Sequence, residues 1–448
     1  MDAYAPVPGE AAGNFSGLSV LDLVKHAALT MIENLDERDR LGVVTFSETA
    51  TTLLGLTSMT EENKVLARAK VRSMVPQSTT NLWAGIETSL GLAKGHHRSG
   101  AVPAIIVLTD GVPNLGCPDN GYVAELRKQM PLPATIHTFG FGYRLRSGML
   151  QSIAEVGGGN YAFIPDSGMV GTVFVHAVAN LQATFAMNAT LEITYKTPLK
   201  IEEAMGNAVH SSRDIVLNMP GLAAQVKDGV LDSSTWFIDA SLGFEAIIDG
   251  NGSRSMAGAR RNVTLASGLP EEELAYHLSR AQLCAFLSNL FPMRQDMEHV
   301  CDPDVATGHL MRQKFQHLLD TIPARKYIDQ RNRSLMDDLK GANPHGQISM
   351  VIHDCNFFVR WGQHYLPSLQ NAHTRQYCSS FKDPGPLQYG TDSPLFIACR
   401  DRLEETFDKL PPPIPSLQSQ QEDSRVATWN EFHGRQSMSN DEPYASRR

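Results

Sequence analysis

The stretch Ala104-Ile105-Ile106-Val107-Leu108-Thr109-Asp110-Gly111 decides the fold. Its short apolar run predicts a strand that is buried on both faces of a parallel sheet. The Thr-Asp-Gly that follows places a carboxylate at the carboxyl end of this strand. In an open α/β sheet, that edge is where ligands bind.

The segments around this stretch alternate between strands and helices. A helix beginning at Ser19 precedes a strand at Leu41–Phe46, and Thr51–Leu56 can pair back on that strand as an antiparallel edge. Further along the chain, Thr135–Phe141 and Asn160–Ile164 are strands separated by helical patterns. Strands that alternate with helices at short intervals predict a doubly wound α/β fold with a parallel sheet.

A polar turn, Ser78-Thr79-Thr80-Asn81-Leu82, opens a further helix. These residues and their order resemble the von Willebrand factor A (vWA) domain. The resemblance implies a metal-ion-dependent adhesion site with a Thr from one loop, an Asp from the next strand end and an Asp-x-Ser-x-Ser on the first strand. It implies Thr80 and Asp110 as ligands of Mg²⁺ or Mn²⁺, because hard divalent ions prefer such oxygens. An acidic side chain of a protein partner would complete the shell.

The sequence departs from this family at its first strand. No Asp-x-Ser-x-Ser occurs, and the chain opens at Met1-Asp2-Ala3, where the residue after that motif is expected. We therefore expect an amino-terminally truncated or misassigned chain that lacks the central first strand. Because a hard divalent ion needs about six oxygens, we expect metal binding to be impaired. The backbone groups facing the lost strand would have no partners.

Residues 182–265 show a different pattern. Short extended runs are separated by Gly, Asn, Pro and Ser, which is typical of an antiparallel β-sandwich. The runs are Ala189–Tyr195, Ile215–Leu217, Thr235–Ala240 and Glu245–Ile248.

From residue 266 to residue 410 the pattern becomes helical, with some mixed segments. Helices are predicted from Pro270, over Asp304–Thr321 and over Tyr327–Leu339, and a short β run over Ile348–Ile352. The Glu272–Phe291 helix and the Trp361–Pro367 segment resemble Vwaint. This domain accompanies vWA in a family of fungal and other eukaryotic proteins with Hedgehog/intein-like relatives.

The predicted organisation has five parts. They are a loop remnant at 1–18, an incomplete vWA domain at 19–181, a β-sandwich at 182–265, a helical or mixed Vwaint-like domain at 266–410 and a disordered tail at 411–448. The tail is assigned because Pro, Ser, Gln and charged residues leave little to bury.

Composition excludes several classes of protein. With 448 residues and a formal net charge of -9, the chain would not be attracted to nucleic acid or to an anionic membrane, so we expect neither partner. We find no long apolar run and no signal peptide pattern. Sparse cysteines favour reduced thiols, so we expect an intracellular, cytoplasmic protein. The cysteines are Cys117, Cys284, Cys301, Cys355, Cys378 and Cys399.

Motifs for catalysis are missing from the sequence. Neither Gly-x-Ser-x-Gly nor a phosphate-binding loop follows the early strands, so we do not expect an enzyme. One cluster has residue types that bind Zn²⁺, but its members lack paired short spacing, which favours a mixture of core Cys and surface His. Its members are His353, Cys355, His364, His373 and Cys378.

The favoured function is a protein-interaction module that presents the loops around Thr80 and Asp110 to a protein partner. In the intact family such binding depends on a divalent ion. One alternative is the substrate-recognition part of a ubiquitin-ligase-type protein, because some relatives carry a U-box. The other is a metalloenzyme that uses the His/Cys cluster.

Overall fold

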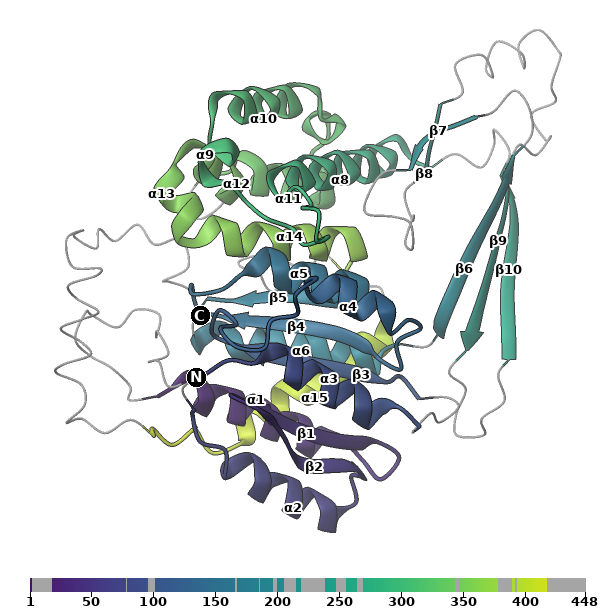
Figure 1. Cartoon of the computed structure of the whole chain (residues 1–448). Helices are drawn as coiled ribbons and strands as arrows, with labels where there is room; N and C mark the ends of the chain where they lie inside the picture. The colour runs from purple at the N-terminus through teal and green to yellow at the C-terminus, as the bar shows by residue number, and fades with distance from the viewer. Residues whose placement is uncertain are drawn as a thin grey trace, which may run out of the picture.

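Three parallel strands lie at the centre of the structure, a computed structural model (Figure 1). They are β3 (Ala104–Thr109), β4 (Thr135–Phe141) and β5 (Gly158–Ile164), in that order. Val107 pairs with Thr138, which in turn pairs with Tyr161. The parallel α/β sheet predicted from the sequence is confirmed. The structure describes residues 1, 18–77, 79–95, 101–165, 167–184, 186–195, 200–204, 215–218, 238–246, 255–263, 269–342, 346–377, 389–390 and 393–416.

The two faces of this sheet pack into two different hydrophobic cores. Because successive side chains in a strand point to opposite faces, each strand contributes to both cores. Tyr161 and Phe163 of β5 enter one core, whereas Ala162 and Ile164 enter the other. The second core is closed by three helices, α1 (Val20–Asn34), α6 (Ser167–Gln182) and α15 (Pro394–Lys409).

A two-stranded antiparallel sheet lies beside the parallel sheet. It consists of β1 (Arg40–Phe46) and β2 (Ala50–Ser58), which confirms the predicted antiparallel edge. In the part of the chain that the structure describes, β1 and β3 belong to separate sheets. All seven residues of β1 are only partly buried, and β3 is less buried than its apolar sequence predicts. The loss of a first strand stays a prediction, because residues 2–17 lie outside the described residues.

Helices connect these strands and cover the sheet. The helices that follow β3 and β4 begin at the carboxyl edge of the sheet, as in other parallel α/β folds. They are α2 (Glu61–Arg72), α3 (Leu82–Ala93), α4 (Tyr122–Lys128) and α5 (Ser147–Val156).

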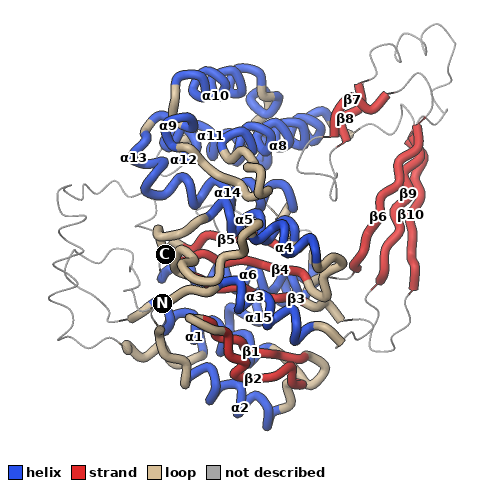
Figure 2. The backbone as a smooth tube through the Cα atoms, viewed as in Figure 1, coloured by secondary structure: helices blue, strands red, loops and turns tan. Residues whose placement is uncertain are grey.

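The segment predicted as a β-sandwich contains antiparallel strands. Figure 2 shows β6 (Ala186–Tyr195), β9 (Ile238–Ala246) and β10 (Ser255–Val263) as one sheet, in which β9 is central. A separate pair is formed by β7 (Lys200–Ala204) and β8 (Ile215–Asn218). The two predicted runs Thr235–Ala240 and Glu245–Ile248 are replaced by the single strand β9. The packing of these sheets into a sandwich stays a prediction.

The carboxyl-terminal half is helical and packs on the sheet. Its elements before α15 are α8 (Glu271–Leu290), α9 (Pro303–Ala306), α10 (His309–Thr321), η2 (Pro323–Lys326), α11 (Gln330–Lys340), α12 (Gln347–His353), α13 (Cys355–Phe357), η3 (Phe358–Gly362) and α14 (Gln363–Arg375). The predicted β run Ile348–Ile352 was wrong, because it lies in α12. Its buried residues Ile348, Val351 and Ile352 follow the three- and four-residue spacing of one helix face.

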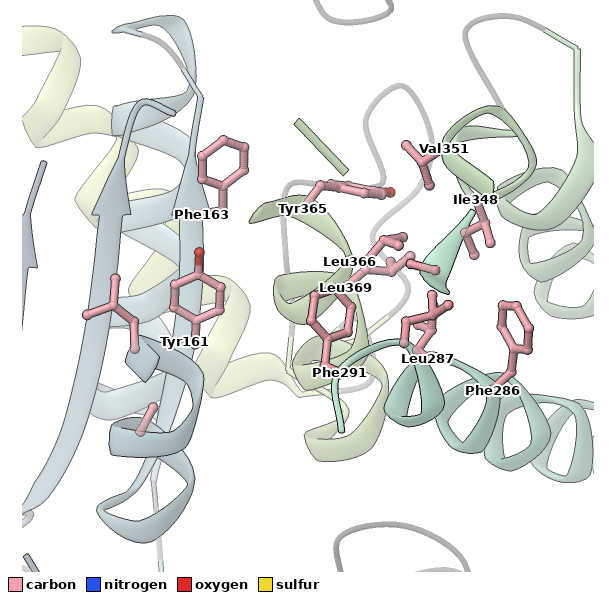
Figure 3. Packing of buried hydrophobic residues seen from close by; sticks show 14 of the residues in the cluster. Tyr161, Phe163, Phe286, Leu287, Phe291, Ile348, Val351, Tyr365, Leu366 and Leu369 are labelled. Carbon is pink, nitrogen blue, oxygen red and sulfur yellow. The ribbon is translucent and has the colours of Figure 1, made fainter. Parts of the chain in front are cut away.

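Helix α14 joins the helical region to the sheet. In Figure 3, α14 lies between Tyr161 and Phe163 of β5 and the α8 residues Phe286 and Leu287, and its side chains Leu366 and Leu369 point toward α8. The backbone N–H of Phe163 donates to Ser368 Oγ of α14 at 3.3 Å. The helical region and the sheet therefore share one hydrophobic core.

The ends of the chain lie largely outside the described residues. Of the predicted loop at 1–18, Met1 and Leu18 are described, and of the predicted tail, residues 411–416. Ser416 donates from its backbone N–H and its hydroxyl to Asp22 Oδ2, at 3.1 and 2.8 Å. This contact brings the segment after α15 to the first turn of α1.

A core substitution tests the shared core. We expect Leu366→Ala, on the fully buried side of α14, to lower the free energy of unfolding by about 2–5 kcal/mol. Sheet and helices should still unfold in one transition. Urea denaturation would be followed in variants that retain only Trp83, in α3, or only Trp361, in η3. The matched control is Leu274→Ala on the exposed side of α8, which should have little effect. Two separate transitions would contradict the shared core.

Candidate functional site

Two loops meet at the carboxyl edge of the sheet. One precedes α3 and contains Thr80, and the other follows β3 and contains Asp110. A Cβ placed on Gly111 would lie 3.8 Å from Thr80 Oγ1, so the two loops are in contact. The loops also exchange hydrogen bonds, from Thr80 N to Asn114 Oδ1 at 2.9 Å and from Asn114 N to Thr80 O at 3.1 Å. The structure therefore brings the loops of both predicted site residues together.

Asn81 ties these loops to the end of β1. Its side-chain oxygen accepts from Ala84 N at 3.1 Å, so Asn81, and not Thr80, is the N-cap of α3. Its backbone N–H donates to Ser47 O at 2.7 Å, and its Nδ2 donates to Glu48 O at 3.0 Å. Asn before an apolar helical pattern is a known N-cap signal, and the sequence prediction passed over it.

Asp110 lies in a partly covered position with apolar neighbours in the same loop. Its side chain is 18% exposed, and its Oδ2 lies 3.1 Å from the amino group of Met1. In the loop that follows, Val112 and Leu115 are 45% and 39% exposed. The edge thus combines a carboxylate, a hydroxyl and exposed apolar side chains.

The described residues do not fit a complete divalent metal site. Thr80 and Asp110 supply two oxygen ligands, whereas Mg²⁺ needs about six. Within the described ranges, no group of three or more His, Cys, Asp or Glu side chains could hold a metal ion. The two oxygens of Thr80 and Asp110 are therefore too few to hold Mg²⁺ or Mn²⁺ by themselves.

The histidines of the predicted His/Cys cluster have separate partners. His364 Nδ1 lies 2.8 Å from Ser147 Oγ, and His373 Nδ1 lies 2.9 Å from Tyr389 OH. Both histidines are buried, so the expectation of surface histidines was wrong for them. His353 is exposed and its Nδ1 contacts Ser349 O, whereas Cys378 lies outside the described residues.

His364 lies beneath the loop between β4 and α5. Its ring packs against Tyr143 of that loop and against Phe163 of β5. Burial lowers the pKa of His364 to about 4, so the ring is neutral at pH 7. Tyr161 OH donates to Ser147 Oγ at 2.8 Å and completes a buried polar chain.

The parallel sheet with helices on both faces defines a domain of the α/β class. The family described as von Willebrand factor type A domain matches residues 15–174. The family described as VWA / Hh protein intein-like, Vwaint, matches residues 329–405. The chain is a vWA-domain protein, and the Vwaint match includes the Trp361–Pro367 segment, whereas the Glu272–Phe291 helix lies outside it.

Three relatives match part of the chain at 26–27% identity. The uncharacterized protein YfbK of Escherichia coli (strain K12) is 26% identical over 177 residues, 39% of this chain and 30% of the relative. The uncharacterized protein sll0103 of Synechocystis sp. is 27% identical over 222 residues, 47% of this chain and 50% of the relative. Human inter-alpha-trypsin inhibitor heavy chain H3 is 27% identical over 201 residues, 42% of this chain and 22% of the relative. The matches thus span half or less of each relative.

Two solved structures match part of the chain. VWA2 from Sulfolobus acidocaldarius, a paralog of ArnB, has a TM-score of 0.46 and 15% identity, over 79% of this chain and 84% of that chain. A von Willebrand factor type A protein from Catenulispora acidiphila has a TM-score of 0.44 and 12% identity, over 60% of this chain and 68% of that chain. In the described part of our chain, no helix is both long and apolar enough to cross a membrane.

The neutral His364 predicts acid sensitivity. Its pKa is lower in the folded protein than in the unfolded chain, so its contribution to stability is full above pH ~6.5 and is lost as the pH falls toward 4. We expect His364→Gln to flatten this decline, by about 2 kcal/mol at pH 5. Urea unfolding at several pH values measures the slope. Ser147→Ala is the control: it removes the hydroxyl partner but should keep the wild-type slope. An unchanged slope in His364→Gln would contradict this assignment.

Proposed function

We propose that the chain is a non-enzymatic protein-interaction module whose partner binds the carboxyl edge of the sheet, at the loops of Thr80 and Asp110. vWA domains generally mediate protein–protein interactions, and this chain contains a vWA domain. The observation that carries the proposal is the reciprocal pair of hydrogen bonds between Thr80 and Asn114, which joins the two loops into one surface.

The arrangement of this edge suits a binding surface. Loops held by Asn81 and Asn114 lose little conformational entropy when a partner binds, because they are already ordered. The exposed Val112 and Leu115 offer apolar area whose burial favours association at about 25 cal/mol per Å². Loops that carry function on a rigid sheet are common in α/β proteins.

In the intact family, partner binding depends on a divalent metal ion. An ion held by Thr80 and Asp110 would supply a coordination position for an acidic side chain of the partner. Because the described residues provide two oxygens, we base partner binding on the loop surface rather than on an ion. We expect an acidic side chain of the partner to take part only if a metal ion is bound.

No contact among the described residues favours a ubiquitin-ligase role or a metalloenzyme over this proposal. The cellular location is also part of the proposal. Cys117, Cys301, Cys355 and Cys399 are free thiols, which supports a reducing, intracellular compartment.

Thermal unfolding with Mg²⁺ tests the metal step. We expect millimolar Mg²⁺ to leave the Tm unchanged, since a ligand that does not bind the native state cannot stabilise it. The same experiment with Asp110→Asn and Thr80→Val provides the controls. A rise in Tm that both substitutions abolish would contradict the expectation and would show that further oxygens complete the site.

Site-specific photo-crosslinking tests the binding edge. A photoreactive residue at Val112 should capture one discrete partner protein, whereas the same residue at Val65, on the exposed side of α2, should not capture it. Asn114→Ala removes the side-chain acceptor for Thr80 N and should reduce capture from position 112. Equal capture from both positions, or capture that Asn114→Ala leaves unchanged, would refute binding at this edge.

A further inference from the structure

The segment between α8 and α9 extends to the carboxyl edge of the sheet. Met293 and His299 form an isolated antiparallel bridge, which folds this segment back on itself. Glu298, next to the bridge, has a side chain that is only 3% exposed. It lies between the residues matched by the two families, 15–174 and 329–405.

Two helices of the vWA domain begin without a side-chain cap of their own. The N-cap residues of α4 and α5 are Gly121 and Arg146, and neither makes a side-chain cap hydrogen bond. Glu298 contacts both helix starts. Its Oε1 accepts from Tyr122 N of α4 at 3.1 Å, and its Oε2 accepts from Arg146 Nη2 at 2.9 Å. A carboxylate at helix N-termini is favoured by the unpaired N–H groups and by the helix dipole.

The fit around this carboxylate is close. Gly121 has φ +82°, and a Cβ there would lie 3.3 Å from Glu298 Oε1. A Cβ on Gly148, in the first turn of α5, would overlap His299 O. His299 also binds α5 directly, since its N–H donates to Ser152 Oγ at 2.8 Å. The segment between α8 and α9 therefore packs against the N-termini of α4 and α5 through its backbone as well as through Glu298.

We infer that Glu298 is a positioning residue for the partner-binding edge. In the loop that contains Asp110, Asn114 holds the middle against Thr80, and Glu298 holds the end through Tyr122 N. Through Arg146, the same carboxylate also holds the loop between β4 and α5. Glu298 thus couples the helical region to the binding edge. The link to the partner rests on the proposed function, whereas the positioning of the loops does not.

Hydrogen exchange of the full chain tests this inference. In Glu298→Ala, amide exchange over residues 111–122 should accelerate by about tenfold, the size expected when a hydrogen bond to a charged group is lost. Glu298→Gln keeps an acceptor for Tyr122 N but loses the charge that pairs with Arg146, so its effect should be smaller. Glu405→Ala, at an exposed ion pair with Lys409 in α15, is the matched control and should leave residues 111–122 unchanged.

Capture from a photoreactive residue at position 112 is the second readout. We expect capture to fall in Glu298→Ala and to recover partly in Glu298→Gln. Unchanged exchange over 111–122 in Glu298→Ala would overturn the inference. Faster exchange with undiminished capture would overturn the coupling to the edge. If the unsubstituted chain captures no partner, the proposed function fails, and the exchange rates still decide whether Glu298 positions the loops.

Discussion

The packing of α14 against β5 is the contact on which the rest of the structure depends. A parallel sheet requires cover on both faces, and an open edge strand needs partners for its backbone. Helix α14 provides both, because the His364 ring packs against Phe163 while Ser368 accepts from the β5 backbone. With α14 in place, α8 and the segment that follows it are held against the sheet.

The binding edge is therefore assembled from distant parts of the chain. Asn81 and Asn114 are contributed by the vWA domain and join the two loops locally. Glu298 and His299 come from the segment after α8 and hold α4 and α5, the helices that follow β3 and β4. Neither set alone holds the whole edge. Local hydrogen bonds fix the shape of the loop surface. The long-range contacts fix the positions of α4 and α5 beneath it.

Local patterns predicted much of the sheet region, because β3, β4, β5 and the first helix have clear periodicity. The meeting of the Thr80 and Asp110 loops follows from topology, since the carboxyl ends of parallel strands share one edge. Ile348–Ile352 was assigned wrongly, because a short apolar run fits a strand and a buried helix equally well. The contact between Tyr122 and Glu298 joins residues 176 positions apart, so no local pattern could indicate it.

Glu298 lies outside both matched regions, so the unit that holds the sheet edge is larger than either match. A vWA domain transferred alone would leave Tyr161 and Phe163 uncovered and would lose the carboxylate at the starts of α4 and α5. A Vwaint-like region transferred alone would lack the surface against which α14 packs. The sheet, the connecting segment and the helices therefore depend on one another for their packing and form one structural unit, which is larger than either family match.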